Sequence, residues 1–277
     1  MSVDANLLVA KFEQIGSRAR VRWDERSAAP VAVDIRRDRE GQYFDLALGR
    51  RANPSRVEVI DARPRERHLL LMTAPERGPG GTARVPSELK RKFLCGHDER
   101  EWFVAAVPER AAAANVRGAM EALKPVEVRR RVESAHVPFD RRNDRRNAAF
   151  VRQGEWFFVR AFWPEVRDIH VTRNELIRRT GGGKPHVAEF ACRTGGEPCY
   201  FDSRSGRAYS IAEFARLRQA KPEYARTLQF QRRNARLLVR GRVRHPDHAT
   251  ILLREWHEVL MNTEHQAEAM RFVAFID

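Results

Sequence analysis

Two histidines bracket a short turn near the end of the chain, in the segment His245-Pro246-Asp247-His248. Proline followed by aspartate at the two middle positions is typical of a type I turn, so we expect a hairpin tip here. The end residues of such a turn lie within about 7 Å of each other at Cα, which brings the two imidazoles close enough to share a metal ion. His257, in the strand expected next, and His186, after a glycine-rich stretch, are the further ligands that we predict.

Histidine ligands in this number fit a divalent transition metal. Zinc takes three histidines and a water, and iron or manganese adds carboxylates. The sequence therefore predicts a metal site at His186, His245, His248 and His257, the last three acting as catalytic residues of a metal-dependent hydrolase or nuclease. The alternative is a polar hairpin tip whose histidines are solvated or pair with Asp247.

Other metal-based nuclease patterns are weaker. An HNH nuclease would use His248, His257 and Asn262, but that family orders its residues His, Asn, His, and here the asparagine comes last. The acidic residues that a two-metal nuclease needs are scattered over the second half of the chain, as Glu155, Glu189, Glu197 and Asp202.

Two further patterns lack an essential part. The stretch Thr180-Gly181-Gly182-Gly183-Lys184 resembles a phosphate-binding loop, but Pro185 stands where the magnesium-binding hydroxyl belongs, so a flexible loop is predicted. Cys95-Gly96-His97 would place a thiol and an imidazole on one face of a strand. Residues 96–100 are instead typical of a turn with solvated side chains, which favours a structural cysteine.

Arginine dominates the composition. The chain has 52 basic and 37 acidic residues and a net charge of +15, and only six of the basic residues are lysines. A basic surplus of this size is the usual electrostatic footprint of polyanion binding, although a GC-rich genome also enriches arginine.

Basic and aromatic residues alternate in two segments, Arg152 to Phe158 and Arg226 to Arg244. Single-stranded nucleic acid is held by this combination, because cations track its phosphates and rings stack on its bases. The alternative is a strand with core aromatics and a solvated arginine face. The nucleic-acid-binding residues that we predict are Arg141, Arg142, Arg145, Arg146, Arg152, Trp156, Lys184, Arg232, Arg233, Arg240 and Arg242.

The cellular compartment follows from what the sequence lacks. Residues 1–13 contain no long apolar run or cleavage site, and the chain has no stretch of 18 uncharged apolar residues. Its three cysteines form no even-numbered disulfide framework. We therefore expect a cytoplasmic protein that does not contact a membrane.

Residues 1–133 are predicted to form an α+β domain. Strands are expected at 42–48, 57–60 and 68–72, the last buried on both faces. A flexible loop follows at 76–83, then a hairpin of 92–95 with 102–107, and a helix at 109–124. Residues 134–149 are charged, asparagine-rich and aperiodic, and are predicted to be a linker or mobile arm.

Residues 150–277 are predicted to form a mainly β domain, barrel- or sandwich-like, with a helical insertion at about 210–236. Strands are expected at 156–159, at 187–191 paired with 198–201, at 237–243, 250–253 and 256–262, and at 272–276. Ser210 and Glu213 form a capping box that opens the first inserted helix. Pro222 opens a second helix, expected to run to about Arg236.

Three motifs of the second half occur together in an uncharacterised bacterial and phage group. They are Arg152-Gln153-Gly154-Glu155 before an apolar strand, Gly183-Lys184-Pro185-His186, and His245-Pro246-Asp247-His248. Residues 150–265 resemble this group, which has no established activity. The resemblance implies a domain boundary near residue 150 and implies that the histidines belong together. This chain has one histidine after the glycines where the group has a pair.

These patterns lead to three hypotheses of function. The first is binding of nucleic acid, with RNA or single strands favoured because no helix-turn-helix, zinc-finger or RNP signature is present. The second is a metal-dependent hydrolase or nuclease at the histidines. The third is an interaction module of a larger complex, possible in phage or defence systems, with a protein partner.

Overall fold

The computed structural model describes residues 4–25, 31–49, 55–75, 90–164, 166–179 and 183–268 of the chain. The strands form four sheets, and the fold is a mixed α+β fold with a mainly β C-terminal region, as predicted. No helix within the described ranges is long and apolar enough to cross a membrane. The predicted strand at 272–276, the whole predicted loop at 76–83 and residues 180–182 of the glycine stretch lie outside these ranges.

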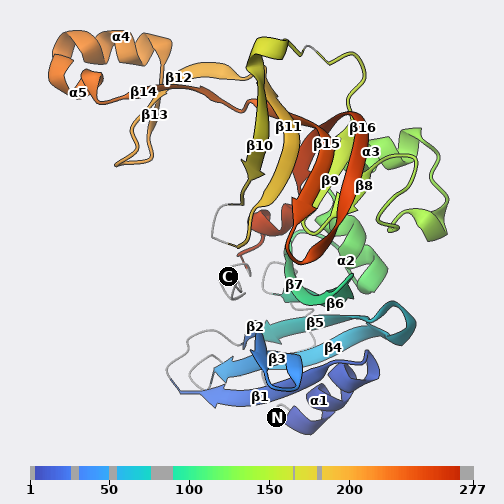
Figure 1. Cartoon of the computed structure of the whole chain (residues 1–277). Helices are drawn as coiled ribbons and strands as arrows, with labels where there is room; N and C mark the ends of the chain where they lie inside the picture. The colour runs from blue at the N-terminus through green and yellow to red at the C-terminus, as the bar shows by residue number, and fades with distance from the viewer. Residues whose placement is uncertain are drawn as a thin grey trace.

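The N-terminal region contains two sheets and one helix (Figure 1). Its elements are α1 (Ala5–Gln14), β1 (Arg18–Asp24), β2 (Val31–Asp38), β3 (Gly41–Gly49), β4 (Ser55–Arg63), β5 (His68–Pro75), β6 (Arg91–Asp98) and β7 (Glu101–Val107). One sheet has the order β1-β3-β2, with β1 parallel to β3, and the other has the order β4-β5-β6-β7. Asp4 begins α1 by accepting a hydrogen bond from the Leu7 amide, and Leu8 and Phe12 are buried from it.

The four-stranded sheet is buried on both faces. One of its faces packs against α1 and the three-stranded sheet. Phe44, Leu69 and Phe93 are fully buried in the core between them. The other face, with Leu70 and Leu94, packs against helix α2 (Val116–Leu123). The apolar run of strand β5 is continuous because both faces of the strand are buried, which confirms the prediction for this strand.

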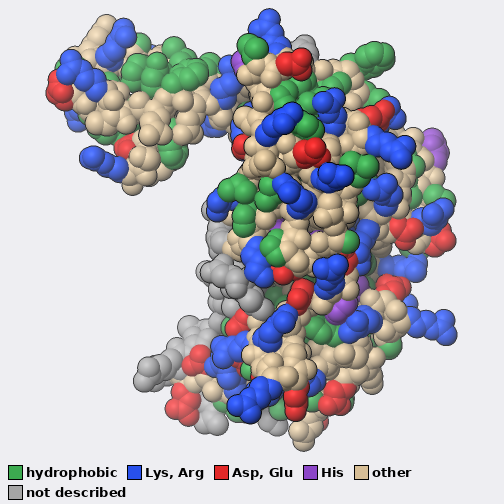
Figure 2. Space-filling model, viewed as in Figure 1, with side chains coloured by type: hydrophobic (Ala, Val, Ile, Leu, Met, Phe, Trp, Pro, Cys, Tyr) green, Lys and Arg blue, Asp and Glu red, His purple; other side chains and the backbone are tan. Residues whose placement is uncertain are grey.

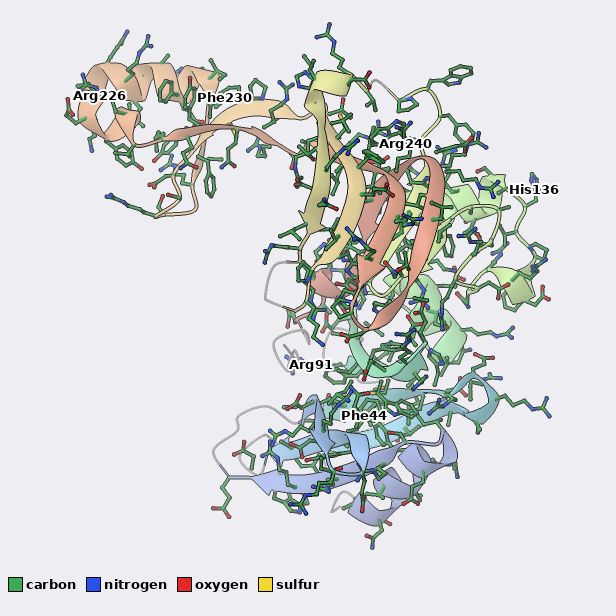
Figure 3. The ribbon with its side chains drawn as sticks, viewed as in Figure 1. Phe44, Arg91, His136, Arg226, Phe230 and Arg240 are labelled. Carbon is green, nitrogen blue, oxygen red and sulfur yellow. The ribbon has the colours of Figure 1, made fainter. Side chains whose placement is uncertain are left out.

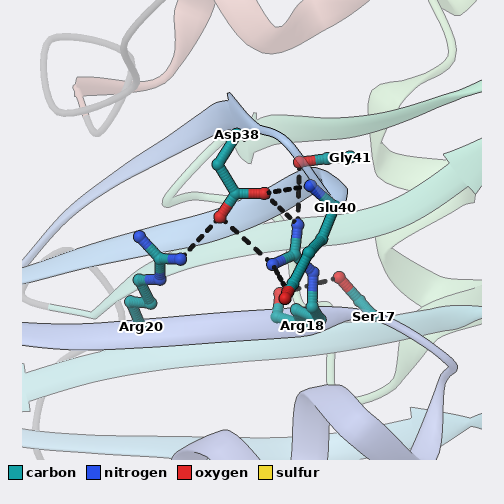
Figure 4. A network of polar contacts seen from close by, with 6 residues as sticks. All are labelled: Ser17, Arg18, Arg20, Asp38, Glu40 and Gly41. Carbon is teal, nitrogen blue, oxygen red and sulfur yellow. Dashed lines mark hydrogen bonds and ion pairs between the residues drawn. The ribbon is translucent and has the colours of Figure 1, made fainter.

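An arginine–carboxylate network joins strand β1 to the turn between β2 and β3 (Figure 4). Asp38 accepts hydrogen bonds from Arg18 at 2.6 and 3.1 Å and from Arg20 at 2.5 Å, and Arg18 also pairs with Glu40 at 2.7 Å. The hydrogen bond from Arg18 lowers the pKa of Asp38 to about 2. Part of the arginine surplus is therefore engaged within the protein.

The hairpin of β6 and β7 is tighter than predicted. The strands continue to Asp98 and resume at Glu101, so that only Glu99 and Arg100 form the turn, and Glu99 has a φ of +56°. Asp98, expected to be solvated, is buried. Cys95 is also buried, and burial raises the pKa of its thiol, which disfavours its use as a nucleophile.

The predicted helix 109–124 is shorter in the structure, and a second helix follows it. Helix α2 begins after Asn115, whose side chain accepts a hydrogen bond from the Gly118 amide. Helix α3 (Val126–Ser134) comes directly afterwards and buries Val128 and Val132. These two valines are four residues apart, and the three arginines between them hid the periodicity.

Residues 134–149, predicted to be a linker, are folded against both regions. Val137 and Ala149 are buried in a core with α3 and Phe157. Arg145 pairs with Asp98 of β6 at 2.8 Å, and Lys124 donates hydrogen bonds to Arg142 O and to Asn143. This segment joins the two regions by specific contacts instead of acting as a spacer.

The C-terminal region contains an open six-stranded sheet of order β10-β11-β15-β16-β9-β8, which is not a closed barrel. Its strands are β8 (Val151–Gln153), β9 (Trp156–Arg160), β10 (Val171–Ile177), β11 (His186–Thr194), β15 (Arg236–His245) and β16 (His248–Met261). Its inner face encloses a core that includes Trp156, Phe158, Val239, Val243 and Leu253. After β16 the chain returns to the N-terminal region, where Ala267 joins the first core.

Several strand predictions for this region were wrong in their boundaries or pairing. The two strands expected at 250–253 and 256–262 are one strand, β16. The strands at 187–191 and 198–201 do not pair with each other, because β11 pairs with β10 and β15.

A small arm projects from the six-stranded sheet (Figures 1 and 3). It contains β12 (Glu197–Phe201), β13 (Ala208–Ser210), α4 (Ile211–Ala220), α5 (Pro222–Arg226) and β14 (Gln229–Arg233). The capping box of Ser210 and Glu213 is present, so the inserted pair of helices is confirmed. The second helix ends at Arg226 instead of near Arg236, because residues 229–233 form β14, which pairs with β12.

Candidate metal centre

The register of the six-stranded sheet brings three histidines together. Pro246 and Asp247 form the tip of the β15–β16 hairpin, as predicted, and His245 faces His248 across it. His186 begins β11, whose Val187 pairs with Arg244, so His186 lies beside His245. One ligand nitrogen from each histidine lies within 4.8 Å of those of the other two.

The three imidazoles are close to parallel. The ring centroid of His186 lies 4.2 Å from that of His245 and 5.7 Å from that of His248. The ring centroids of His245 and His248 are 4.7 Å apart. Two nitrogens bound to one tetrahedral zinc at about 2.1 Å lie about 3.4 Å apart. Binding of a shared ion therefore requires the nitrogens to approach by up to about 1.4 Å through side-chain rotation.

His186 has no hydrogen-bond partner although its side chain is buried. It is 1% exposed, and neither of its ring nitrogens forms a hydrogen bond with a described residue. Burial, together with His245 and His248, lowers the pKa of His186 to about 2, so the ring is neutral and keeps a lone pair. An unpartnered buried imidazole costs folding free energy unless a ligand satisfies it.

His245 is held by two hydrogen bonds that define its tautomer. Nε2 lies 3.1 Å from Lys184 O, which can only accept, so Nε2 carries the proton. Nδ1 accepts the Asp247 amide at 3.1 Å. A metal ion would take the place of that amide at Nδ1, and the bond from Nε2 to the carbonyl would then orient the ligand, as is usual for metal-bound histidine.

The turn between β8 and β9 makes room for His248. A Cβ on Gly154 would lie 2.9 Å from His248 Nε2 and 3.6 Å from His186 Nε2, and Gly154 has a φ of +57°. A side chain at this position would therefore be strained and would occupy the space between the two rings. The Arg152-Gln153-Gly154-Glu155 motif thus lies against the histidines, a contact that no local pattern indicated.

Unpartnered polar atoms gather around this cluster. Besides both nitrogens of His186, Gln153 Oε1, Trp156 Nε1 and His248 Nδ1 are buried without a hydrogen-bond partner among the described residues. Gln153 is itself fully buried, and its amide donates to Ala249 O at 2.6 Å. Buried polar atoms are rarely left unsatisfied, so a bound water or ion would complete the hydrogen bonding of these groups.

His245 and His248 line a cavity of about 580 Å³ between the two regions of the chain, and His186 lies behind them outside its lining. Its polar lining includes His245, His248, Glu155, Arg152 and Glu264. Its apolar lining includes Leu94, Phe103, Met120, Leu123, Phe150 and Phe157. Its size and mixed lining are typical of a small-molecule site, and such sites are common between domains.

Two carboxylates stand near the histidines. Glu99 Oε2 lies 3.9 Å from His248 Nδ1, accepts the Ala249 amide, and its carboxylate pairs with Arg145 at 2.7 Å. Glu155 lines the cavity. Glu189, Glu197 and Asp202, the other acidic residues considered from the sequence, are not part of its described lining. Glu99 was missed because the sequence placed it in a solvated turn.

A third carboxylate, Glu264, is buried in the cavity wall at 3% exposure, 3.3 Å from Arg179. Burial raises the pKa of Glu264 to about 7, although Arg179 opposes this shift. The folded protein therefore binds this proton more tightly than the unfolded chain. The resulting stability is fully present below the pKa of the unfolded chain and is lost as the pH rises through about 7.

We expect Glu264→Gln to remove this pH dependence, because glutamine keeps an acceptor and never carries a charge. Between about pH 4.5 and pH 8, the wild-type protein should lose up to about 3 kcal/mol through this group, and the variant should not. Urea unfolding at both pH values measures the difference. An unchanged pH dependence in the variant would show that Glu264 titrates normally.

The structure separates His257 from the other predicted ligands. It lies nine residues after His248 in the same strand, which corresponds to roughly 25 to 30 Å. His257 Nδ1 lies 2.7 Å from Glu255 O. The HNH arrangement of His248, His257 and Asn262 therefore does not come together either.

Most of the residues predicted to bind nucleic acid are engaged within the chain. Trp156, predicted to stack on bases, is 8% exposed and belongs to the core, which corrects that assignment. Five of the cations pair with carboxylates of the described residues: Arg141, Arg145, Arg152, Arg233 and Lys184. Arg142 and Arg232 donate to backbone carbonyls. Arg146 is exposed, as are Arg240 and Arg242 on β15.

Comparison with known proteins adds no assignment. No protein-family model matches the chain, and neither a curated protein nor a solved structure matches it. The resemblance of residues 150–265 to an uncharacterised group stays a prediction.

Proposed function

We propose that this protein is a metal-dependent hydrolase that binds a divalent transition metal through His186, His245 and His248. The observation that carries the proposal is the unpartnered buried imidazole of His186, which lies against His245 and His248, two histidines that line a cavity. Three neutral nitrogen ligands with an open position are the usual protein environment of catalytic zinc, and also suit manganese or iron.

The chemistry of such a centre is activation of water. A metal held by three histidines lowers the pKa of a bound water to about 7, which supplies a nucleophile at neutral pH. Glu155 lines the cavity beside His245 and His248 and is the residue that we assign as general base. Arg152, Arg179 and Lys184 also line the cavity, each paired with a carboxylate of the chain.

Hydrolysis by metal-loaded protein tests this proposal. Chelator-stripped protein would be assayed on bis(p-nitrophenyl) phosphate and on p-nitrophenyl acetate, before and after addition of Zn²⁺ or Mn²⁺. We expect hydrolysis only after addition of metal, and an about 100-fold or greater loss of kcat in Glu155→Gln, since general bases contribute that much.

The Glu155→Gln variant also separates the two parts of the proposal. It should retain the metal, because Glu155 is not among the predicted ligands. Equal activity with and without metal would contradict the proposed function. If the protein binds metal but hydrolyses neither ester, the metal site is supported and the hydrolase assignment is rejected.

A further inference from the structure

A row of cations and rings crosses the outer face of the six-stranded sheet, opposite its core. The strand register places Arg173 of β10 beside Phe190 of β11, and Phe190 beside Arg240 of β15. The guanidinium carbon of Arg173 lies 5.2 Å from the centre of the Phe190 ring, and that of Arg240 lies 5.6 Å from it. Arg240 also lies 5.0 Å from the centre of the Trp256 ring on β16.

This row, which we call the outer-face row, consists of Arg173, Phe190, Arg240 and Trp256. Both arginines are exposed and both rings are half-buried, so part of each ring is accessible to solvent. Lys and Arg side chains are spread over the part of the sheet turned toward the viewer in Figure 2, and Arg240 is labelled there in Figure 3. The row spans four neighbouring strands, or about 14 Å.

Arg193 and Arg236 of this sheet pair with Glu175 and Glu258, but the two arginines of the outer-face row have no such partner among the described residues. Within the described ranges, neither Arg173 nor Arg240 forms an ion pair, and the neighbouring Arg242 side chain forms none. This contrasts with Arg145 and Arg152, which share the buried Asp98. Part of the net charge of +15 is therefore presented on this sheet face, together with aromatic rings.

We infer that the outer-face row binds single-stranded nucleic acid. Free guanidinium groups attract phosphates, and the rings next to them offer planes on which bases stack. A four-stranded sheet with two aromatic side chains stacks two or three bases in a well-known RNA-binding module, which shows that a surface of this size suffices. An acidic protein segment would match the charge but would not need the alternation of rings and cations.

This inference is independent of the proposed hydrolase, because the outer-face row shares no residue with the metal centre. It changes the residues expected to contact nucleic acid. Trp156 and Arg152 are replaced by Phe190, Trp256 and Arg173, and Arg240 is retained.

Fluorescence anisotropy with a labelled oligouridine of about 15 nucleotides tests the inference, with salt varied from about 50 to 200 mM. We expect Trp256→Ala to weaken binding by about fivefold or more, the loss typical of one stacked base, and Trp256→Phe to restore most of it. Arg240→Ala should weaken binding and reduce the salt slope by about 1.

Arg233→Ala is the matched control. It also removes one positive surface charge, but Arg233 lies in the arm and pairs with Glu197 at 2.6 Å. We expect its affinity to equal that of the wild-type protein. The inference is overturned if no oligouridine binds at about 50 mM salt, or if Arg233→Ala and Arg240→Ala weaken binding equally. It is also overturned if a duplex or poly-glutamate binds as tightly as the single strand.

Discussion

His186→Leu is expected to stabilise the metal-free protein and to abolish its stabilisation by Zn²⁺. The wild-type imidazole is buried with both nitrogens unpartnered, which costs about 1–3 kcal/mol that an apolar side chain of similar size does not incur. We therefore expect the free energy of unfolding of the metal-free variant to rise by about 1–2 kcal/mol. Wild-type protein should gain about 2.7 kcal/mol in Zn²⁺ at 100 times the dissociation constant, and the variant should gain none.

Two opposite effects of one substitution distinguish a ligand from a structural residue. Urea unfolding with and without Zn²⁺ measures both. His257→Leu is the control, since His257 was predicted as a ligand from the sequence but lies far along β16 from the other three histidines. That variant should keep the full response to Zn²⁺. A His186→Leu protein that still responds to Zn²⁺ would remove His186 from the site.

Asp98→Ala is expected to lower the free energy of unfolding by about 3 kcal/mol, because it leaves the largely buried Arg152 without a carboxylate, whereas Arg145 keeps its pair with Glu99. The Asp98 side chain is 8% exposed, and it pairs with Arg145 at 2.8 Å and with Arg152 at 2.9 Å. Burial alone would raise the pKa of Asp98, but the two arginines lower it. These pairs join the β6–β7 hairpin to the segment 134–149 and to β8.

Asp144→Ala provides the comparison for this effect. Asp144 pairs with Arg141 at 3.5 Å, and both side chains are well exposed, so the loss should stay below about 0.5 kcal/mol. Thermal or urea unfolding measures both variants under the same conditions. If Asp98→Ala costs no more than Asp144→Ala, the buried pairs do not hold the two regions together.

The hairpin tip was predictable because its signal is local. Pro246 and Asp247 specify a turn whatever surrounds them, and the turn places His245 opposite His248. His186 was predicted as a ligand from its place after the glycine stretch, and the register of β11 with β15 confirms that it lies beside them. His257 was assigned to the cluster because residues 250–262 were divided into two strands. Residues 248–261 form one continuous strand, β16, in which His257 lies nine residues beyond His248.

The remaining parts of the site depend on contacts between distant segments. Gly154 approaches His248 from the β8–β9 turn, and Glu99 approaches it from the β6–β7 turn of the N-terminal region. No local sequence pattern at either residue predicts this contact. The segment 134–149 is not a spacer for a similar reason, since Arg145 pairs with Asp98, about 50 residues earlier in the chain. Trp156 was predicted to stack on bases, but β9 is buried on both faces, so that Trp156 lies in a core.

The most direct test of the proposed metal centre is elemental analysis after dialysis. Chelator-stripped protein would be equilibrated with Zn²⁺ and dialysed against metal-free buffer, and the bound metal would then be measured. The wild-type protein and His257→Leu should each retain a single zinc ion per chain, and His186→Leu should retain none. Wild-type protein that keeps no zinc, or a His186→Leu protein that keeps as much as the wild type, would contradict the proposed centre.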